Sequence, residues 1–472
     1  MGGLTMRKRN WIQTCVVVLL CVVLAACGSG NNAGNTNAGG ASDSGSGNVS
    51  DGGSNNSGQS SGNSGKVTNI SMQIVWASDS GRGKAIRELL DEFEAQNPDI
   101  KVEMLGGVQY GQKLLTQILS GKSPEVLQVA YGEVKALAAE GAFLDLTGDF
   151  ASYEENYYPE IWELALSDGK LYGVPWLGHT IQLVYNKNMF EEAGITAPPA
   201  TWEELYEVAK KLTVDKDGDG KPDQFGIGLS GKQGPDLTWM FGMFAAQAGA
   251  KLVKEEGGRY QVALNSPEGI QALEFYTKLL KETSPPDSLN KDGGGVMADF
   301  RNQVVAMELQ GPWGVPDVWK AGNPFEVGVA EVPAGPAGRA TEVTAYLLSV
   351  PVGVEGDKLA ASKKLIEFLA SKPAQEQIMK GEVGDDGNYY PFRIPIRKDL
   401  ADTAYFKDHP EFLVYQKGLE YPFTLVPVPQ WQQVSDEIYQ SVLNQVVSGS
   451  LSAEEGLKML EERGNEILAK AQ

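Results

Sequence analysis

Aromatic side chains of this chain fall at the expected ends of strands and in turns, and not only at the spacing of a buried core. They are Trp76, Tyr131, Trp176, Trp239, Trp313, Tyr346 and Trp431. A flat ring stacks against the apolar C–H face of a pyranose, whose rim of hydroxyl groups needs short donors and acceptors nearby. Rings in such places therefore predict a cleft for a sugar-like ligand.

Polar side chains that suit this rim adjoin the rings in the sequence. They are Ser78, Asp79 and Arg82 after Trp76, His179 and Thr180 after Trp176, Asp236 and Thr238 before Trp239, and Gln310 before Trp313. A tryptophan taken singly is more often a core residue than a ligand platform, so both interpretations stay open for these rings. Trp313 differs, because Gly311 and Pro312 hold it in a loop directly after an expected strand.

An acidic loop at residues 215–223, DKDGDGKPD, places oxygen atoms at the ligand positions of an EF-hand-type calcium loop. The expected metal ligands are the carboxylates of Asp215, Asp217, Asp219 and Asp223 and the backbone carbonyl of Lys221. The twelfth position is Gly226, so the bidentate carboxylate of such a loop is absent. Two interpretations remain open: a structural Ca²⁺ held with altered coordination, and an Asp/Gly turn between a helix and a strand.

Motifs for catalysis are scarce. His179 and His409 are the only histidines, and the expected folded part has neither a cysteine, a Gly-x-Ser-x-Gly motif nor a complete phosphate-binding loop. Paired carboxylates of the glycosidase kind have no sequence signature, because their separation is a three-dimensional property. We expect a binding protein without a catalytic cofactor, and a secreted carbohydrate-active enzyme stays the alternative.

Residues 1–26 have the features of a secretory signal peptide, with Arg7-Lys8-Arg9 before an apolar run over 16–24. This run is shorter than the roughly 20 residues of a membrane-spanning helix, which favours a signal peptide over a transmembrane anchor. Leu24-Ala25-Ala26-Cys27-Gly28 resembles a bacterial lipobox, which implies that Cys27 is acylated and begins the mature chain. Residues 27–66 then form a flexible tether, because Gly, Ser and Asn cannot build a packed core.

The pattern of elements predicts an α/β fold with two lobes. A chain of 472 residues exceeds the size at which one hydrophobic core stops growing. Strands at 69–77, 100–104 and 124–130 alternate with helices at 84–96 and 110–119, which predicts a mostly parallel sheet covered on both faces. Later strands are expected at 225–229, 304–309, 325–332 and 344–350, and later helices at 201–212, 237–248, 267–281, 297–304, 358–371, 373–380, 434–447 and 453–469.

Residues 171–194, LYGVPWLGHTIQLVYNKNMFEEAG, combine a turn, a short strand and a helix start, which suits a crossing between two lobes. The stretch resembles the signature of family 1 extracellular solute-binding proteins, the sugar-binding components of ABC importers, in Leu183-Val184-Tyr185-Asn186 followed by Phe190 and Glu192. Gln310-Gly311-Pro312-Trp313 is similar to an element of the maltose-binding-protein-like members whose tryptophan stacks on sugar. The resemblance extends over residues 67–470.

The resemblance implies a periplasmic-binding-protein-like fold in which a hinge and a ligand cleft separate two α/β lobes. The N-terminal lobe is expected at 67–177 plus 346–392, and the C-terminal lobe at 178–345 plus 393–472. By the same resemblance His179, Trp239 and Trp313 fall in the cleft, while Ser78, Asp79 and Tyr131 top the first lobe. His179 stands where maltose binders have an acidic residue, so the resemblance does not identify the sugar.

The implied function is capture of a carbohydrate by hinge closure and its delivery to an ABC permease, and the expected carbohydrate is an oligosaccharide. The protein would be a monomer held by its N-terminal lipid, such as palmitate, on the outer face of the membrane of a Gram-positive bacterium. A net charge of −21 argues against nucleic acid or an anionic membrane surface as a partner. A lipoprotein that reports sugar to a sensor kinase is a further alternative.

Overall fold

Alternating apolar residues begin the folded part in β1 (Thr68–Ile74), where Ile70, Met72 and Ile74 are buried. The computed structural model describes residues 66–470 except 258, 402, 424–427 and 429. The predicted signal peptide at 1–26, the acylation site Cys27 and all of the tether before Lys66 lie outside the described residues. None of the helices in the described part is long and apolar enough to cross a membrane.

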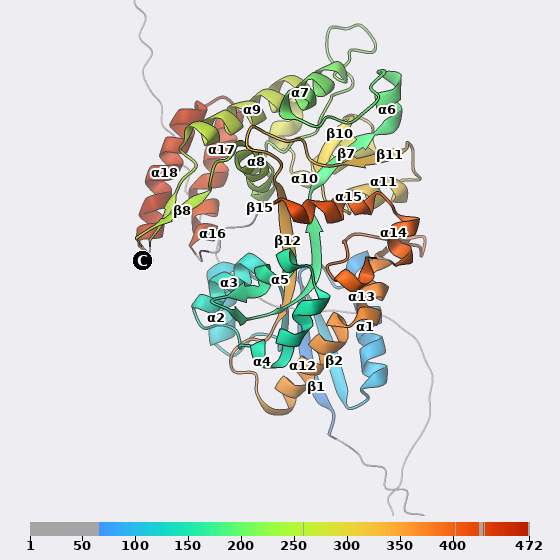
Figure 1. Ribbon diagram of the computed structural model, residues 1–472, viewed down its shortest axis with the longest axis vertical. Helices are drawn as coiled ribbons and strands as arrows, with labels where there is room; N and C mark the ends of the chain where they lie inside the picture. The colour runs from blue at the N-terminus through green and yellow to red at the C-terminus, as the bar shows by residue number, and fades with distance from the viewer. Residues whose placement is uncertain (1–65, 258, 402, 424–427, 429, 471–472) are drawn as a thin grey trace, which may run out of the picture. The chain divides into compact units, whose positions relative to one another are not determined.

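The first three strands confirm the predicted alternation. β1 pairs in parallel with both β2 (Ile100–Gly106) and β3 (Val126–Ala130), and the connections contain α1 (Gly81–Gln96) and α2 (Gly111–Leu119). Ser80 caps α1 by accepting a hydrogen bond from Gly83 N–H. Figure 1 shows α1, α12 (Gly356–Ala370) and α13 (Lys372–Met379) beside these strands.

A long strand from far along the chain, β12 (Thr341–Ser349), completes the sheet in the other direction. It pairs antiparallel with β3 and with β6 (Val174–Thr180) and in parallel with β15 (Pro422–Phe423). The strand order is β15-β12-β3-β1-β2, with β6 also paired to β12. The parallel pairing that the sequence predicts therefore fails where β12 meets β3 and β6, because β12 does not arrive through the short helical crossover that makes neighbouring strands parallel.

A second, antiparallel sheet has the order β10-β7-β11. Its strands are β7 (Gln182–Asn186), β10 (Met307–Gln310) and β11 (Val327–Ala330). Helices α8 (Pro235–Ala248), α9 (Pro267–Thr283), α17 (Gln440–Val447) and α18 (Ala453–Ala469) lie close together, as Figure 1 shows. Ser452 and Glu455 form a capping box at the start of α18.

The other elements connect these parts. They are α3 (Tyr131–Ala139), α4 (Thr147–Phe150), η1 (Ala151–Asn156), α5 (Pro159–Ala165), β4 (Leu166–Ser167), β5 (Lys170–Leu171), α6 (Lys187–Glu192), α7 (Trp202–Lys211), β8 (Val253–Glu256), β9 (Arg259–Val262), η2 (Pro286–Asn290), α10 (Gly293–Arg301), α11 (Gly314–Lys320), β13 (Glu382–Val383), β14 (Tyr389–Tyr390), η3 (Lys398–Leu400), α14 (Ala404–Asp408), α15 (Phe412–Lys417), η4 (Gly418–Glu420), α16 (Trp431–Val434) and η5 (Ser435–Tyr439).

Three predicted elements differ from the structure. The helix expected at 297–304 is α10, which starts four residues earlier because Asp292 caps it through Gly295 N–H ahead of a run of glycines. The strand expected at 225–229 forms only isolated bridges, from Phe225 to Val305 and from Gly228 to Glu308. The helix expected at 434–447 is interrupted by the π-helical turn η5.

Buried apolar residues form two clusters. The first cluster gathers around β1, β3, β6 and β12, and the second around β7, α8, α9, α17 and α18. Buried residues of the segment from Phe392 to Leu419 belong to the first cluster. Trp313 is partly buried and packs against both clusters. The exact boundaries of the two expected lobes stay predictions.

Candidate functional site

Three side chains of β12 reach one cavity through the alternation of the strand. Glu342, Thr344 and Tyr346 line it, whereas Val343 and Ala345 between them are buried in the first cluster. Successive side chains of a strand point to opposite faces, so a spacing of two places all three on one face.

The first turns of two helices form another part of the wall. α8 supplies Asp236 and Trp239, and α10 supplies Gly293. Asp236 ties these pieces together, because its Oδ1 accepts a hydrogen bond from Trp239 Nε1 at 2.9 Å and its Oδ2 accepts one from the Gly293 N–H at 2.8 Å. The wall is thus held in place by hydrogen bonds of its own.

Trp313 is positioned by the residues that precede it. β10 ends at Gln310, and Gly311 and Pro312 carry the chain to Trp313 at the start of α11. A Cβ at position 311 would collide with the indole, so only glycine lets the ring lie there. His179 lies in β6, where it pairs with Thr344 of β12. Its ring meets the ring of Trp313 edge-on, with 4.9 Å between the ring centroids.

The cavity that these residues line has a volume of about 500 Å³ and takes side chains from both clusters. We call it the aromatic cavity, because it is lined by the rings of Trp76, Tyr110, Trp239, Trp313 and Tyr346. Trp76 follows β1 and Ala130 ends β3, so the carboxyl ends of two parallel strands meet at its edge. Ligands of α/β proteins commonly bind at such an edge, and the volume is typical of a small-molecule site.

An arginine from the segment after β14 enters among these rings. The guanidinium carbon of Arg393 lies 5.1 Å from the ring centroid of Trp76, 4.9 Å from that of Trp313 and 5.6 Å from that of Tyr346. Arg82 lies 5.6 Å from the Trp76 ring and pairs with Glu382 at 3.1 Å. These distances permit attraction between the cations and the ring faces.

Burial changes the charge state of two lining residues. It lowers the pKa of His179 well below its usual value, and the positive charges of Arg393 and Arg82 act in the same direction, so the imidazole is neutral at pH 7. Burial raises the pKa of Glu342 to about 7, although the Thr344 hydroxyl opposes the shift by donating a hydrogen bond to it at 3.1 Å. Near neutral pH, Glu342 can therefore either donate or accept a proton in a hydrogen bond.

Several buried polar atoms of the aromatic cavity have no partner among the described residues. They are His179 Nδ1, Gln310 Nε2 and Arg393 Nε. A buried polar group without a hydrogen bond costs free energy, and a ligand with hydroxyl or anionic oxygens relieves that cost. The cavity thus combines flat rings with unsatisfied polar atoms, which is the arrangement that a polyol ligand needs.

Eight of the sequence-predicted ligand residues line the aromatic cavity: Trp76, Arg82, His179, Asp236, Trp239, Gln310, Trp313 and Tyr346. Four do not. Ser78 and Asp79 are exposed beyond its edge, and Tyr131 and Trp176 are buried in the first cluster. Trp176 is fully buried among the apolar residues of the first cluster, whereas His179, three residues later in the same strand β6, lines the cavity.

Sequence reasoning missed other lining residues, among them Tyr110, Glu342, Thr344 and Arg393. Glu342 and Thr344 carry a usable signal, because they lie four and two residues before the predicted Tyr346 in one strand. Arg393 carries none, since its place depends on packing far along the chain.

A second chamber adjoins the aromatic cavity and contains the remaining predicted ring, Trp431. The two share Tyr110, Trp239 and Glu342, and the chamber has a volume of about 460 Å³. Glu133 also lines this chamber, and burial raises its pKa. The site is therefore longer than one cavity.

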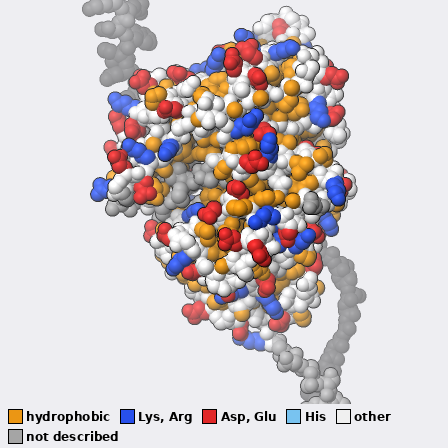
Figure 2. Space-filling model, in the orientation of Figure 1, with side chains coloured by type: hydrophobic (Ala, Val, Ile, Leu, Met, Phe, Trp, Pro, Cys, Tyr) orange, Lys and Arg blue, Asp and Glu red, His pale blue; other side chains and the backbone are white. Residues whose placement is uncertain are grey.

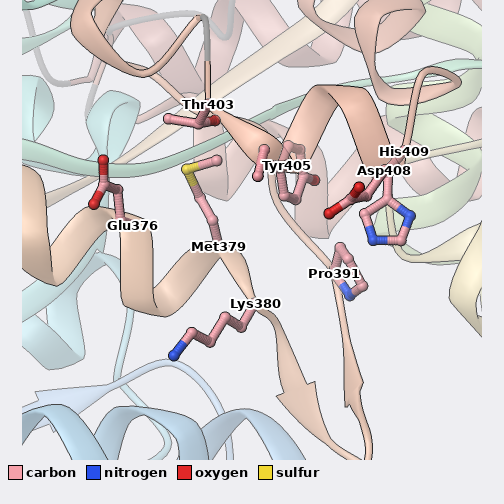
Figure 3. Close-up of a pocket in the computed structure, with 9 residues that line it drawn as sticks. Glu376, Met379, Lys380, Pro391, Thr403, Tyr405, Asp408 and His409 are labelled. Carbon is pink, nitrogen blue, oxygen red and sulfur yellow. The ribbon is translucent and has the colours of Figure 1, made fainter.

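A separate groove of about 520 Å³ lies between α13 and α14. Figure 3 shows Glu376, Met379 and Lys380 on one side and Tyr405 and His409 on the other. We call it the α13–α14 groove. None of the sequence-predicted ligand residues lines it.

The acidic loop brings three of its predicted metal ligands together. Carboxylate oxygens of Asp215, Asp217 and Asp223 lie within 4.8 Å of one another, and all three residues are exposed. Asp219 instead accepts a hydrogen bond from the Lys221 N–H at 2.8 Å. Hydrogen bonds from backbone N–H groups of the loop also reach Asp215 and Asp223. The acidic group can hold a metal ion.

Known proteins share this architecture. A solute-binding protein of an ABC transporter from Thermotoga lettingae, bound with α-D-tagatose, is 26% identical, and the match covers 85% of this chain and 99% of that one with a TM-score of 0.71. A substrate-binding protein from Listeria monocytogenes in complex with cycloalternan is 26% identical, with 86% and 100% covered and a TM-score of 0.69. The multiple sugar-binding protein of Streptococcus mutans is 22% identical over 309 residues, which are 62% of this chain and 69% of that protein.

These similarities establish the periplasmic-binding-protein fold that the sequence predicts. The sequence model of one family matches residues 77–376, well over half of the chain, and its members bind solutes instead of converting them. The chain belongs to the family of bacterial extracellular solute-binding proteins.

Proposed function

We propose that this protein captures a carbohydrate outside the cell and delivers it to the permease of an ABC importer. The observation that carries the proposal is the aromatic cavity, where Trp76, Trp313 and Tyr346 stand beside buried polar atoms without partners. The sugars bound by the Thermotoga and Listeria proteins support it. The solute is held by stacking on the rings and by hydrogen bonds at their rim.

The ligand is an oligosaccharide. The second chamber continues the aromatic cavity past Trp239 and offers Trp431 as a further ring. One pyranose leaves the chamber without contacts, whereas a chain of sugars reaches both. The two expected lobes close on this chain, because side chains of both clusters line the cavity and only the closed form lets all of them touch the solute.

Titration calorimetry of the full-length chain against mono- and oligosaccharides tests the proposal. We expect saturable binding, tighter for oligosaccharides, and no product when the incubated sugars are separated by chromatography. Product formation would support the enzyme alternative, and the absence of binding to every saccharide would refute the proposal. Sugar uptake that survives deletion of the gene would instead point to a sensing role.

Two finer parts of the proposal concern the lipid on Cys27 and a metal ion in the acidic loop. Cys27 carries a lipid that holds the protein as a monomer at the outer face of the membrane. Labelled palmitate should be incorporated into wild type but not into Cys27→Ala, which lacks the thiol.

The acidic loop binds Ca²⁺ through Asp215, Asp217 and Asp223, whose carboxylate oxygens lie close together. Chelation should lower the melting temperature by a few degrees, but not after Asp215→Asn; an identical melt with and without Ca²⁺ would refute the calcium site.

A further inference from the structure

Two buried arginines four residues apart differ in one respect. Arg393 and Arg397 are each only 5% exposed. Arg397 makes a two-pronged ion pair with Asp399, from Nε to Oδ1 at 2.9 Å and from Nη2 to Oδ2 at 2.7 Å, and donates to the Ala370 carbonyl. Arg393 forms no ion pair with any described carboxylate; its Nη1 donates to the Phe392 carbonyl at 2.7 Å and its Nε has no partner.

This difference matters because a buried charge is costly without a counter-ion. The rings around Arg393 attract the cation, but such contacts are weaker than an ion pair in a desolvated place. They do hold the flat guanidinium in a fixed orientation. Its remaining N–H groups then match the two oxygens of a carboxylate or a phosphate. Burial also lowers the pKa of Arg393 to about 9, with the positive charge of Arg82 acting in the same direction, and the opposing effects of Tyr346 and Glu382 are too small to offset it.

The other charges of the aromatic cavity are compatible with an anionic guest. Arg82 adds a second cation to the lining. Both oxygens of Asp236 already accept hydrogen bonds within the protein, and Glu342 is partly neutral near pH 7. The first turns of α8 and α10, which line the cavity, add partial positive charge from their N–H groups.

We propose that the solute is an acidic saccharide whose carboxylate or phosphate group pairs with Arg393. The proposal rests on the proposed function, because it names the chemical class of sugar for the same site. The anionic group supplies the counter-ion that Arg397 finds in Asp399 and that Arg393 lacks. The uncharged rings of the saccharide then extend over Trp313 and toward the second chamber.

Calorimetry with the full-length chain tests the proposal by comparing its affinities for matched neutral and anionic sugars. The panel pairs neutral oligosaccharides with counterparts in which one sugar is oxidised to a uronic acid, and with counterparts that carry one phosphate. We expect wild type to bind an anionic member at least about tenfold more tightly than its neutral partner, since a desolvated charge pair is worth more than that step in affinity. Whether the uronate or the phosphate binds more tightly identifies the anionic group.

Variants assign the preference to its residue. Arg393→Gln should remove the preference for the anionic sugar while it still binds the neutral one, and Arg393→Lys should restore part of it. Arg397→Gln is the matched control, because it breaks a buried pair outside the cavity and should lower the melting temperature without changing the preference. Raising the salt concentration should weaken the binding of anionic sugars to wild type and leave that of neutral sugars unchanged, which tests the inference even where a variant fails to fold.

The outcomes separate the two proposals. Equal or tighter binding of the neutral sugars by wild type overturns the acidic saccharide but leaves the carbohydrate function in place. An equal loss of both kinds of sugar in Arg393→Gln overturns it as well. Failure of every saccharide, neutral or anionic, instead refutes the proposed function itself.

Discussion

The aromatic cavity and the α13–α14 groove have nearly the same volume, about 500 and 520 Å³, but their linings differ. The charged residues of the groove, Glu376, Lys380 and Asp408, are exposed and already solvated. Glu342 and Arg393 in the aromatic cavity are at least nine-tenths buried, and polar atoms of the cavity lack partners. Volume therefore does not identify the site. Desolvated polar groups beside flat rings do, because a ligand that enters the cavity can satisfy them while it stacks on the rings.

The charges on the visible face of the molecule do not indicate a further binding site. Figure 2 shows Lys and Arg side chains interspersed with Asp and Glu over the visible face of the molecule. Mixed charge of this kind neither collects nor repels a polyanion strongly. The difference between the aromatic cavity and the groove is then the main guide to function, and substitutions in each of the two test it.

The largest effect is expected from Trp313→Ala. Loss of an aromatic platform that packs against both clusters should weaken sugar binding by about 1–3 kcal/mol. Trp313→Phe keeps a flat ring and should recover part of the affinity. Calorimetry with the tightest-binding saccharide measures both. Lys380→Ala in the groove is the control and should bind as wild type does; an equal loss in this control would break the comparison.

The buried acid of the aromatic cavity gives a pH-dependent effect of intermediate size. Because burial raises the pKa of Glu342 from 4.5 to about 7, the folded state holds a proton that the unfolded state releases first. Below about pH 4.5 the carboxyl group is protonated in both states and burial costs no ionisation energy. The free energy of unfolding then falls as pH rises from 4.5 through 7. Glu342→Gln cannot ionise and therefore does not show this loss. The difference in free energy of unfolding between variant and wild type should thus shift in favour of the variant by about 2 kcal/mol from pH 5 to pH 8.

Urea unfolding at pH 5 and pH 8 measures this difference. The exposed residue Glu466 provides the control, since Glu466→Gln should leave the pH dependence of wild type unchanged. A constant difference between Glu342→Gln and wild type at the two pH values would show that Glu342 is ionised throughout and that the aromatic cavity is more solvated than its geometry indicates.

The sequence was informative wherever a local pattern decides the outcome. Alternation and capping residues predicted the parallel strands β1 to β3 and the helices between them, and the Gly-Pro pair predicted that Trp313 directly follows a strand in a turn. The direction of β12 was not predictable in this way, because its pairing with β3 and β6 joins segments far apart in the chain.

The candidate site shows the same limit. Trp176 and Tyr346 look alike as rings near strand ends, but Trp176 is fully buried in the first cluster, whereas Tyr346 is partly buried and lines the aromatic cavity. Burial of this kind depends on the layers above and below a strand, which no local pattern records. Arg393 is the extreme case, since its position follows from long-range packing alone.

The smallest effect is expected where the two hollows touch. Tyr405 lines the groove, yet its hydroxyl donates a hydrogen bond of 2.8 Å to the backbone carbonyl of Arg393, which lines the aromatic cavity. Tyr405→Phe removes that one bond and keeps the ring, so stability should fall by about 1 kcal/mol, the net worth of a hydrogen bond. Sugar affinity, measured by calorimetry, should change less than threefold, because the rings around Arg393 still hold its side chain. A loss of tenfold or more would mean that the groove positions the arginine, and the distinction between a binding cavity and an unrelated hollow would then have to be replaced by one continuous site.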